Sequence, residues 1–174
     1  MKDQKANTKL LKFYDITYPS NPNNSTKKDN IFILSGEHPR ELIAVETTFH
    51  FMKFLCKNKE TEEVKNLLEK NVLRVNVNAN PYKRMEVEKG DFCVRGNPNN
   101  VDINRNWNYF WGKNIETGEE NPGKKPFSEI ETVFIKESIK KFNPKLFLTI
   151  HSGEYSLFHP YAFSDEKTEN RIGN

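Results

Sequence analysis

The sequence has few cysteines, no long apolar run and only a small excess of charge, and each shortage excludes a class of protein. Two cysteines among 174 residues, Cys56 and Cys93, are too few for a disulfide scaffold or a zinc finger. We expect Cys56 to be a buried free thiol, because it falls on the apolar face of a predicted helix. A disulfide between the two cysteines is the alternative.

Charge and hydropathy exclude further partners. Lys and Arg number 27 against 24 Asp and Glu, the net charge is +3, and no basic block stands out, so we expect no nucleic-acid partner. No apolar run approaches the ~20 residues that span a bilayer, so we expect no membrane segment. Residues 1–9 are polar, which predicts a disordered start without a secretory signal.

Hydrophobic periodicity predicts an alternation of strands and helices. Strands are expected at residues 10–18, 31–34, 72–78 and 146–150, the first of them at a sheet edge. Helices are expected at residues 39–57, with Pro39 in the first turn, at residues 60–70, and from a capping box of Ser128 and Glu131 to about residue 141. This order predicts one α/β domain over residues 10–174, with a mixed, mostly parallel sheet and helices on both faces.

Residues 82–127 are the least regular part of the sequence. Glycine, proline and asparagine are frequent there, and a long irregular region within a compact domain is usually functional or disordered. The same region contains Trp107, Tyr109, Phe110 and Trp111, and this aromatic content argues against simple disorder. We therefore expect an ordered functional loop, in which the tryptophans pack.

Two histidines occupy equivalent places in the predicted fold. His38 comes soon after the apolar strand at 31–34, and His151 directly follows the strand at 146–150. Ligands bind at the carboxyl ends of strands in open α/β sheets. Glu41 is three residues after His38, and two imidazoles with one carboxylate make a catalytic zinc set that leaves a fourth position open.

Taken singly, these residues have simpler interpretations. A lone histidine at a strand end is most often a hydrogen-bonding residue, and a histidine and a glutamate three apart make a weak motif. His50 falls in the middle of a predicted helix and His159 lies beyond the strand end, so neither is expected to bind a metal.

Three segments make the zinc hypothesis specific. GEHPRE, RGNPNNVDINRNW and FLTIHS resemble, in this order and at plausible separations, the three signature blocks of the zinc metallocarboxypeptidases, the carboxypeptidase A-like peptidases of family M14. The resemblance covers roughly residues 31–163. It implies that one Zn²⁺ ion is bound by His38, Glu41 and His151, and that the substrate is the C-terminus of a peptide or protein.

The resemblance also implies roles for four polar side chains. Arg95 matches the arginine that stabilises the oxyanion, Asn104 and Arg105 match the pair that binds the substrate's C-terminal carboxylate, and Arg40 matches a substrate-contacting arginine. A guanidinium suits both tasks, because it binds a carboxylate through two hydrogen bonds and stabilises developing negative charge. Without the resemblance, Arg95 and Arg105 would be interpreted as surface residues.

The sequence departs from the family pattern after the third block. The family's general base is a glutamate on a strand well downstream of the third ligand, and Glu154, Glu166 and Glu169 come too early for that role. The resemblance therefore implies a domain that lacks its C-terminal part and its general base, and doubtful activity for the chain as it stands. Two alternatives stay open: a zinc amidohydrolase that acts on acylated amino acids or peptidoglycan peptides, and a non-catalytic zinc- or peptide-binding module.

Overall fold

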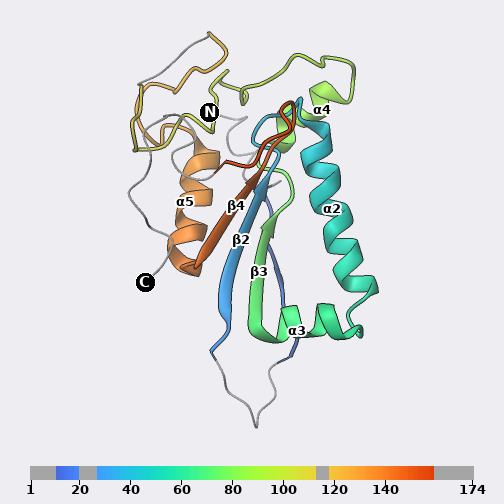
Figure 1. The fold of residues 1–174 in the computed structure, drawn as a ribbon. Coiled ribbons are helices and arrows are strands. Elements are labelled where there is room, and N and C mark those ends of the chain that lie inside the picture. The colour runs from blue at the N-terminus through green and yellow to red at the C-terminus, as the bar shows by residue number, and fades with distance from the viewer. Residues whose placement is uncertain (1–10, 20–26, 113–117, 159–174) are drawn as a thin grey trace.

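Four strands form a single mixed sheet in the computed structural model, which describes residues 11–19, 27–112 and 118–158. The strands are β1 (Tyr14–Ile16), β2 (Asp29–Ser35), β3 (Asn71–Asn76) and β4 (Leu146–Ile150), and their order in the sheet is β1-β3-β2-β4 (Figure 1). β2 runs parallel to β3 and β4, whereas β1 pairs antiparallel with β3 at one edge. The predicted mixed, mostly parallel sheet is confirmed. The expectations for residues 1–9 and for His159 concern positions outside the described residues.

Helices cover both faces of the sheet. α2 (Leu42–Lys57) and α3 (Glu62–Lys70) lie on one side and α5 (Ile130–Phe142) on the other (Figure 1). The sheet has one hydrophobic core on each face. Ile33 of β2 packs into the core on the side of α2 and α3. Its neighbours Phe32 and Leu34 pack into the core on the other side, with Ile135 and Phe142 of α5. A strand buried on both faces needs a continuous apolar run, which explains the composition of β2.

Three local predictions at helices were wrong. α2 begins at Leu42, so Pro39 lies in the preceding turn, and the Glu41 side chain at the N-cap makes no capping bond, because its carboxylate bonds two histidines instead. α5 begins after Glu129, and the Ser128 hydroxyl donates to the Glu129 carboxylate instead of forming a capping box. A short helix, α4 (Pro81–Val87), occupies the start of the region expected to be irregular.

The predicted burial of Cys56 was also wrong, although its thiol is free as expected. Cys56 and Cys93 are both free and both exposed. Leu55, one residue earlier on α2, is 1% exposed and belongs to the core that α2 and α3 form with the sheet. Successive side chains on a helix point about 100° apart, so the burial of Leu55 turns Cys56 outward.

Side-chain amides order the loop between α4 and α5. Buried Asn106 donates to the carbonyls of Pro122 and Lys125 and accepts from the Glu129 N–H and the Thr132 hydroxyl.

Asn97 accepts from the N–H groups of Asn99 and Val101 and donates to the carboxylates of Glu129 and Glu131. These bonds attach the loop to the start of α5, and they supply the backbone with partners that a helix or sheet would otherwise provide.

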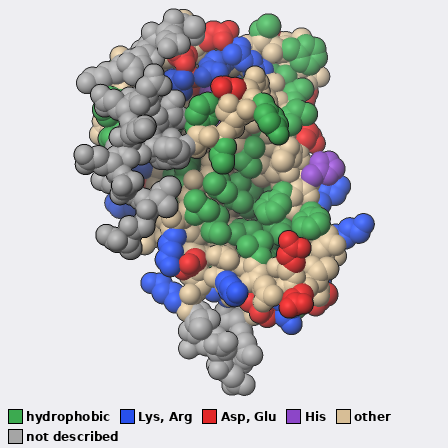
Figure 2. Space-filling model, in the orientation of Figure 1, with side chains coloured by type: hydrophobic (Ala, Val, Ile, Leu, Met, Phe, Trp, Pro, Cys, Tyr) green, Lys and Arg blue, Asp and Glu red, His purple; other side chains and the backbone are tan. Residues whose placement is uncertain are grey.

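β4 forms the second edge of the sheet within the described residues. Leu146, Phe147 and Leu148 on this strand are 40–46% exposed, and Figure 2 shows hydrophobic side chains gathered over β4 and the adjoining side of α2. No helix in the described part of the chain is long and apolar enough to cross a membrane.

Candidate metal centre

At Gly36 the chain makes a tight turn, and the segment GEHPRE therefore lies over the end of the sheet. Gly36 has φ +71°, a left-handed conformation that glycine adopts without strain. A Cβ at this position would lie 2.8 Å from Val45 Cγ2 and 2.9 Å from Asn78 Oδ1. Conformation and close packing therefore both require glycine here, and the turn brings Glu37 and His38 to the carboxyl end of β2.

We expect Gly36→Ala to destabilise the protein far more than Gly112→Ala. Both glycines have φ +71°, but a Cβ at Gly112 meets nothing within 4 Å. The left-handed conformation costs alanine about 1–2 kcal/mol at either position, and the clash at Gly36 adds roughly 1–3 kcal/mol. Urea unfolding of the two variants measures the difference; equal losses would show that the close packing at Gly36 is unimportant.

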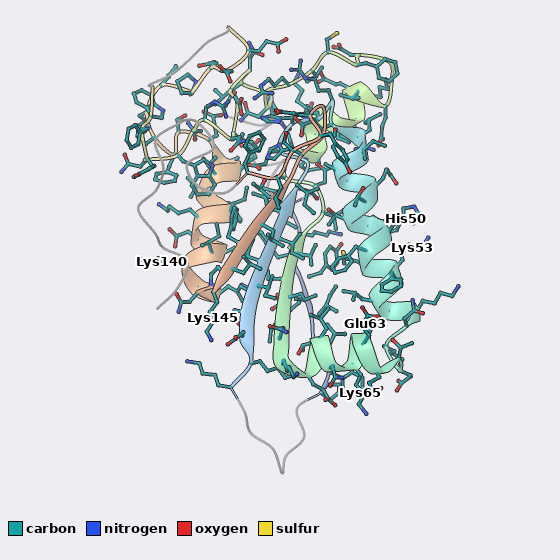
Figure 3. The ribbon with its side chains drawn as sticks, viewed as in Figure 1. His50, Lys53, Glu63, Lys65, Lys140 and Lys145 are labelled. Atoms are coloured by element: carbon teal, nitrogen blue, oxygen red, sulfur yellow. The ribbon has the colours of Figure 1, made fainter. Side chains whose placement is uncertain are left out.

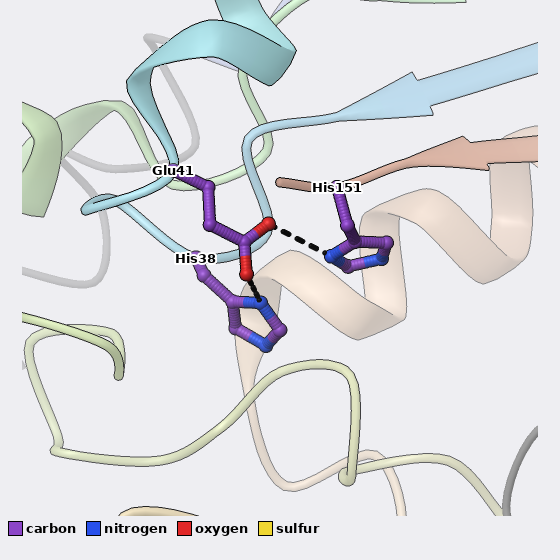
Figure 4. A group of neighbouring side chains, drawn as sticks. All are labelled: His38, Glu41 and His151. Atoms are coloured by element: carbon purple, nitrogen blue, oxygen red, sulfur yellow. Dashed lines mark hydrogen bonds and ion pairs between the residues drawn. The ribbon is translucent and has the colours of Figure 1, made fainter. Parts of the chain in front are cut away.

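Glu41 joins the two histidines of the predicted zinc set (Figure 4). One carboxylate oxygen lies 2.6 Å from His38 Nδ1, and the other lies 3.0 Å from His151 Nδ1. The two imidazole rings are 5.0 Å apart, centroid to centroid. One ligand atom from each of the three residues falls within 4.8 Å of the others, so these residues can hold one metal ion.

A second carboxylate faces the outer nitrogen of each imidazole. His38 Nε2 lies 3.1 Å from Asp102 Oδ1, and His151 Nε2 lies 3.2 Å from Glu37 Oε2. Asp102 and Glu37 are 0% and 3% exposed. Hydrogen bonds of this kind to the nitrogen away from a metal orient histidine ligands and select their tautomer.

Burial and hydrogen bonding act in opposite directions on the pKa values of these groups. Burial alone would lower the pKa of His151, but its hydrogen bonds to Glu37 and Glu41 outweigh that effect and raise the pKa to about 10. Burial would raise the pKa of Glu41, yet the two histidines hold it at about 2. The pKa of His38 is raised for the same reason as that of His151, by Asp102 and Glu41, despite burial. Protons and a metal cation compete for such a cluster of donor atoms.

Asp102 also connects the histidines to Arg95. The Nε and Nη2 groups of Arg95 donate to Asp102 Oδ2 at 2.9 and 2.8 Å, while the other oxygen faces His38. Burial would raise the pKa of Asp102, but its hydrogen bond to His38 and the nearby arginine charges lower it. Arg95 also lines a cavity of about 310 Å³.

The other predicted substrate residues, Asn104, Arg105 and Arg40, are more exposed than the buried carboxylates of the centre. The backbone N–H of Asn104 donates to Asp102 Oδ1 at 2.9 Å. Arg105 pairs with Glu120 at 2.5 Å, and Arg40 pairs with Glu119 at 2.9 Å. Two adjacent glutamates thus neutralise both arginines. His50 lies away from the centre, on the outer side of α2, as Figure 3 shows.

Sequence reasoning missed Glu37 and Asp102, although both lie inside the quoted blocks. Their positions next to His38 and within VDINRN were visible. Their partners were not, because each carboxylate contacts a residue at least 64 positions away, His38 for Asp102 and His151 for Glu37.

The donor set fits a zinc ion. Imidazole nitrogens and a carboxylate are ligands that zinc accepts, and three protein ligands are typical of catalytic zinc sites. Here both Nδ1 atoms face the shared carboxylate, and a second hydrogen-bond partner restrains each ring from outside.

Known proteins with similar sequences include zinc carboxypeptidases and an inactive metallocarboxypeptidase of Ajellomyces capsulatus. "Zinc carboxypeptidase A 1" of Anopheles gambiae is 27% identical over 161 residues, which cover 82% of this chain and 36% of that protein. "Zinc carboxypeptidase" of Simulium vittatum is 30% identical over 165 residues, which cover 84% of this chain and 53% of that protein. The chain thus spans between about a third and a half of the length of these relatives.

Solved structures give the same fold. The crystal structure of thrombin-activatable fibrinolysis inhibitor matches with a TM-score of 0.80 at 20% identity, over 91% of this chain and 43% of that one. The family model for the zinc carboxypeptidases, peptidase family M14, matches residues 6–173. This match covers nearly the whole sequence and confirms the resemblance of the three blocks: the chain belongs to the zinc carboxypeptidase family.

Proposed function

We propose that this chain forms the zinc-binding part of a metallocarboxypeptidase domain that releases C-terminal residues from peptides. His38, Glu41 and His151 hold one Zn²⁺ ion. The arrangement of both Nδ1 atoms around the two oxygens of Glu41 carries this proposal. It brings ligand atoms from the turn after β2, from the residue after β4 and from the N-cap of α2 close together. A zinc ion there acts as a Lewis acid on a substrate carbonyl and on water.

In this proposal Arg95 stabilises the negative charge that develops on the carbonyl oxygen of the scissile bond. Its guanidinium is tied to Asp102, whose other oxygen contacts His38. Buried Asp102 therefore contacts both the arginine and a zinc ligand, and it holds the two side chains at a fixed separation. A donor held in advance at the position of developing charge lowers the barrier without reorganising during the reaction.

Asn104 and Arg105 bind the C-terminal carboxylate of the substrate in the same proposal. Arg105 is 34% exposed, so its guanidinium is accessible from solvent. Glu120 already supplies it with a carboxylate partner. A substrate carboxylate must therefore displace Glu120, or share the guanidinium with it.

Peptides with free and amidated C-termini test the function directly. We expect the zinc-loaded chain to bind the free peptide more tightly, because charge-assisted hydrogen bonds are worth about 1.5–3 kcal/mol. That corresponds to a roughly 10- to 100-fold difference in Kd. Arg105→Gln should remove the difference, and calorimetry with matched peptide pairs measures it. Release of the C-terminal residue, followed by mass spectrometry and stopped by a chelator, reports catalysis.

Glu120→Gln is the informative companion variant. Removing its charge eliminates the internal competitor for Arg105, so the free peptide should bind more tightly than it binds wild type, while the amidated peptide should be unaffected. Equal binding of free and amidated peptides by the wild type and by Arg105→Gln would rule out carboxylate recognition by Arg105.

A further inference from the structure

Glu37 is a buried carboxylate that the proposed reaction does not use. Its residue is 3% exposed, although it lies between Gly36 and a zinc-ligand candidate on a turn. Burying a carboxylate is costly unless it is paired and hydrogen-bonded. A partner must therefore compensate for its burial.

The partners of Glu37 both come from β4 and the residue that follows it. The Thr149 hydroxyl donates to Glu37 Oε2 at 2.5 Å, and His151 Nε2 lies 3.2 Å from the same oxygen. Thr149 Oγ1 is also 2.9 Å from His151 Nε2. His151 Nε2 thus faces two oxygens that can accept from an Nε2–H group, the Thr149 hydroxyl and the Glu37 carboxylate that orients this hydroxyl.

The sheet brings these three residues together. β2 and β4 are neighbours, and Leu34 lies opposite Thr149 in their parallel register. The Gly36 turn then places Glu37 over the end of β4. The separation in sequence is 112 residues between Glu37 and Thr149, so only the strand pairing makes the contact.

The arrangement repeats the one around His38. In both cases Nδ1 faces Glu41 and Nε2 faces a second buried carboxylate, Asp102 for His38 and Glu37 for His151. A hydrogen held on Nε2 leaves Nδ1 as the nitrogen that offers a lone pair toward the common point. With a metal on the Nδ1 side, each outer carboxylate selects the same tautomer, Nε2–H, in its own imidazole.

We propose that Glu37, acting through Thr149 and directly, is a positioning residue that holds His151 with Nδ1 turned toward the metal. The inference rests on the proposed function, because the choice of nitrogen matters only when His151 is a ligand. Glu37 is not among the residues whose ligand atoms converge on one point, so its effect passes through the imidazole.

Substitution of Glu37 by glutamine is the first test. An amide can donate as well as accept, so it does not select a tautomer. We expect Glu37→Gln to weaken zinc binding about 10- to 100-fold, the range found for such outer hydrogen-bond partners, and competition with a chelating dye measures this. Histidine ¹⁵N spectra of the zinc-loaded protein should show one Nε2–H form of His151 in wild type and a mixture in the variant.

Three further variants keep the test decisive. Thr149→Val removes the linking hydroxyl and should weaken zinc binding in the same direction, and Glu37→Asp should restore part of the affinity lost in Glu37→Gln. Thr149→Val and Glu37→Asp also test the positioning role if Glu37→Gln fails to fold. Glu154→Gln makes the same chemical change at an exposed position three residues after His151 and should leave affinity and spectra unchanged.

The outcomes separate the inference from the function on which it rests. Wild-type zinc affinity and spectra in Glu37→Gln and Thr149→Val would overturn the positioning role and leave the zinc site intact. A loss of thermal stability alone, without a change in the His151 spectrum, would overturn it too. Failure of the wild type to bind zinc would overturn the proposed function and this inference with it.

Discussion

His151→Ala should abolish zinc binding, whereas the wild type should bind one equivalent. The substitution removes one of three donors and leaves the others unable to close the site. At a free zinc concentration one hundred times Kd, binding stabilises a protein by about 2.7 kcal/mol. For a chain of this size that raises the unfolding midpoint by roughly 5–10 °C, and the variant should show no such increase. Thermal melts with and without zinc measure this increase in the unfolding midpoint. Because each protein is compared with itself, a difference in stability between the metal-free variant and the metal-free wild type does not affect the result.

His50→Ala is the matched control. It removes the same side chain from an exposed position on α2, away from the candidate centre (Figure 3). We expect it to keep the wild-type stoichiometry and the zinc-induced increase in midpoint. Equal stoichiometry in wild type and His151→Ala would contradict the assignment of His151 as a ligand.

Phe32→Ala should cause the largest loss of stability. Phe32 is 0% exposed, and its ring lies 5.9, 6.3 and 5.6 Å from the rings of Phe13, Phe142 and Phe147. These contacts join the sheet to α5. Truncating a buried phenylalanine costs about 3–5 kcal/mol, a large part of the 5–15 kcal/mol typical of a domain. Urea unfolding measures the change in the free energy of unfolding.

Phe54→Ala makes the same truncation on the outer side of α2. Phe54 is 52% exposed, and substitutions at such positions usually change stability by less than about 0.5 kcal/mol. A loss in Phe32→Ala as small as that in Phe54→Ala would mean that the core between the sheet and α5 contributes little.

Periodic apolar patterns predicted β2, β3, β4 and the long helices well, whereas the strand expected at residues 10–18 is the short β1 (Tyr14–Ile16). The run Ile31–Leu34 predicted β2, and the last residue expected for α2, Lys57, is the one observed. α4 was missed because only two of its seven residues, Arg84 and Val87, are buried, which is too few for a detectable period. The burial of Cys56 was mispredicted because a stripe of apolar residues defines a face only to within about one residue.

The grouping of His38, Glu41 and His151 was predicted because these residues adjoin elements that the sequence reveals. His38 and Glu41 are neighbours in one block, and His151 directly follows an apolar strand. Parallel strands end at the same edge of a sheet, so local pattern alone brought these residues close in prediction. Glu37 and Asp102 offered no comparable signal, because buried and exposed carboxylates look the same in a sequence.

The sequence by itself determined the family, the alternation of strands and helices, and the block that contains His38 and Glu41. These depend on local order and periodicity. Only the tertiary structure decided that both imidazoles turn Nδ1 toward Glu41, that Asp102 joins His38 to Arg95, and that Glu37 faces His151. The reason is physical: ring orientation depends on hydrogen bonds to residues distant in sequence, and those partners meet only once β2, β4 and the loop before α5 have packed.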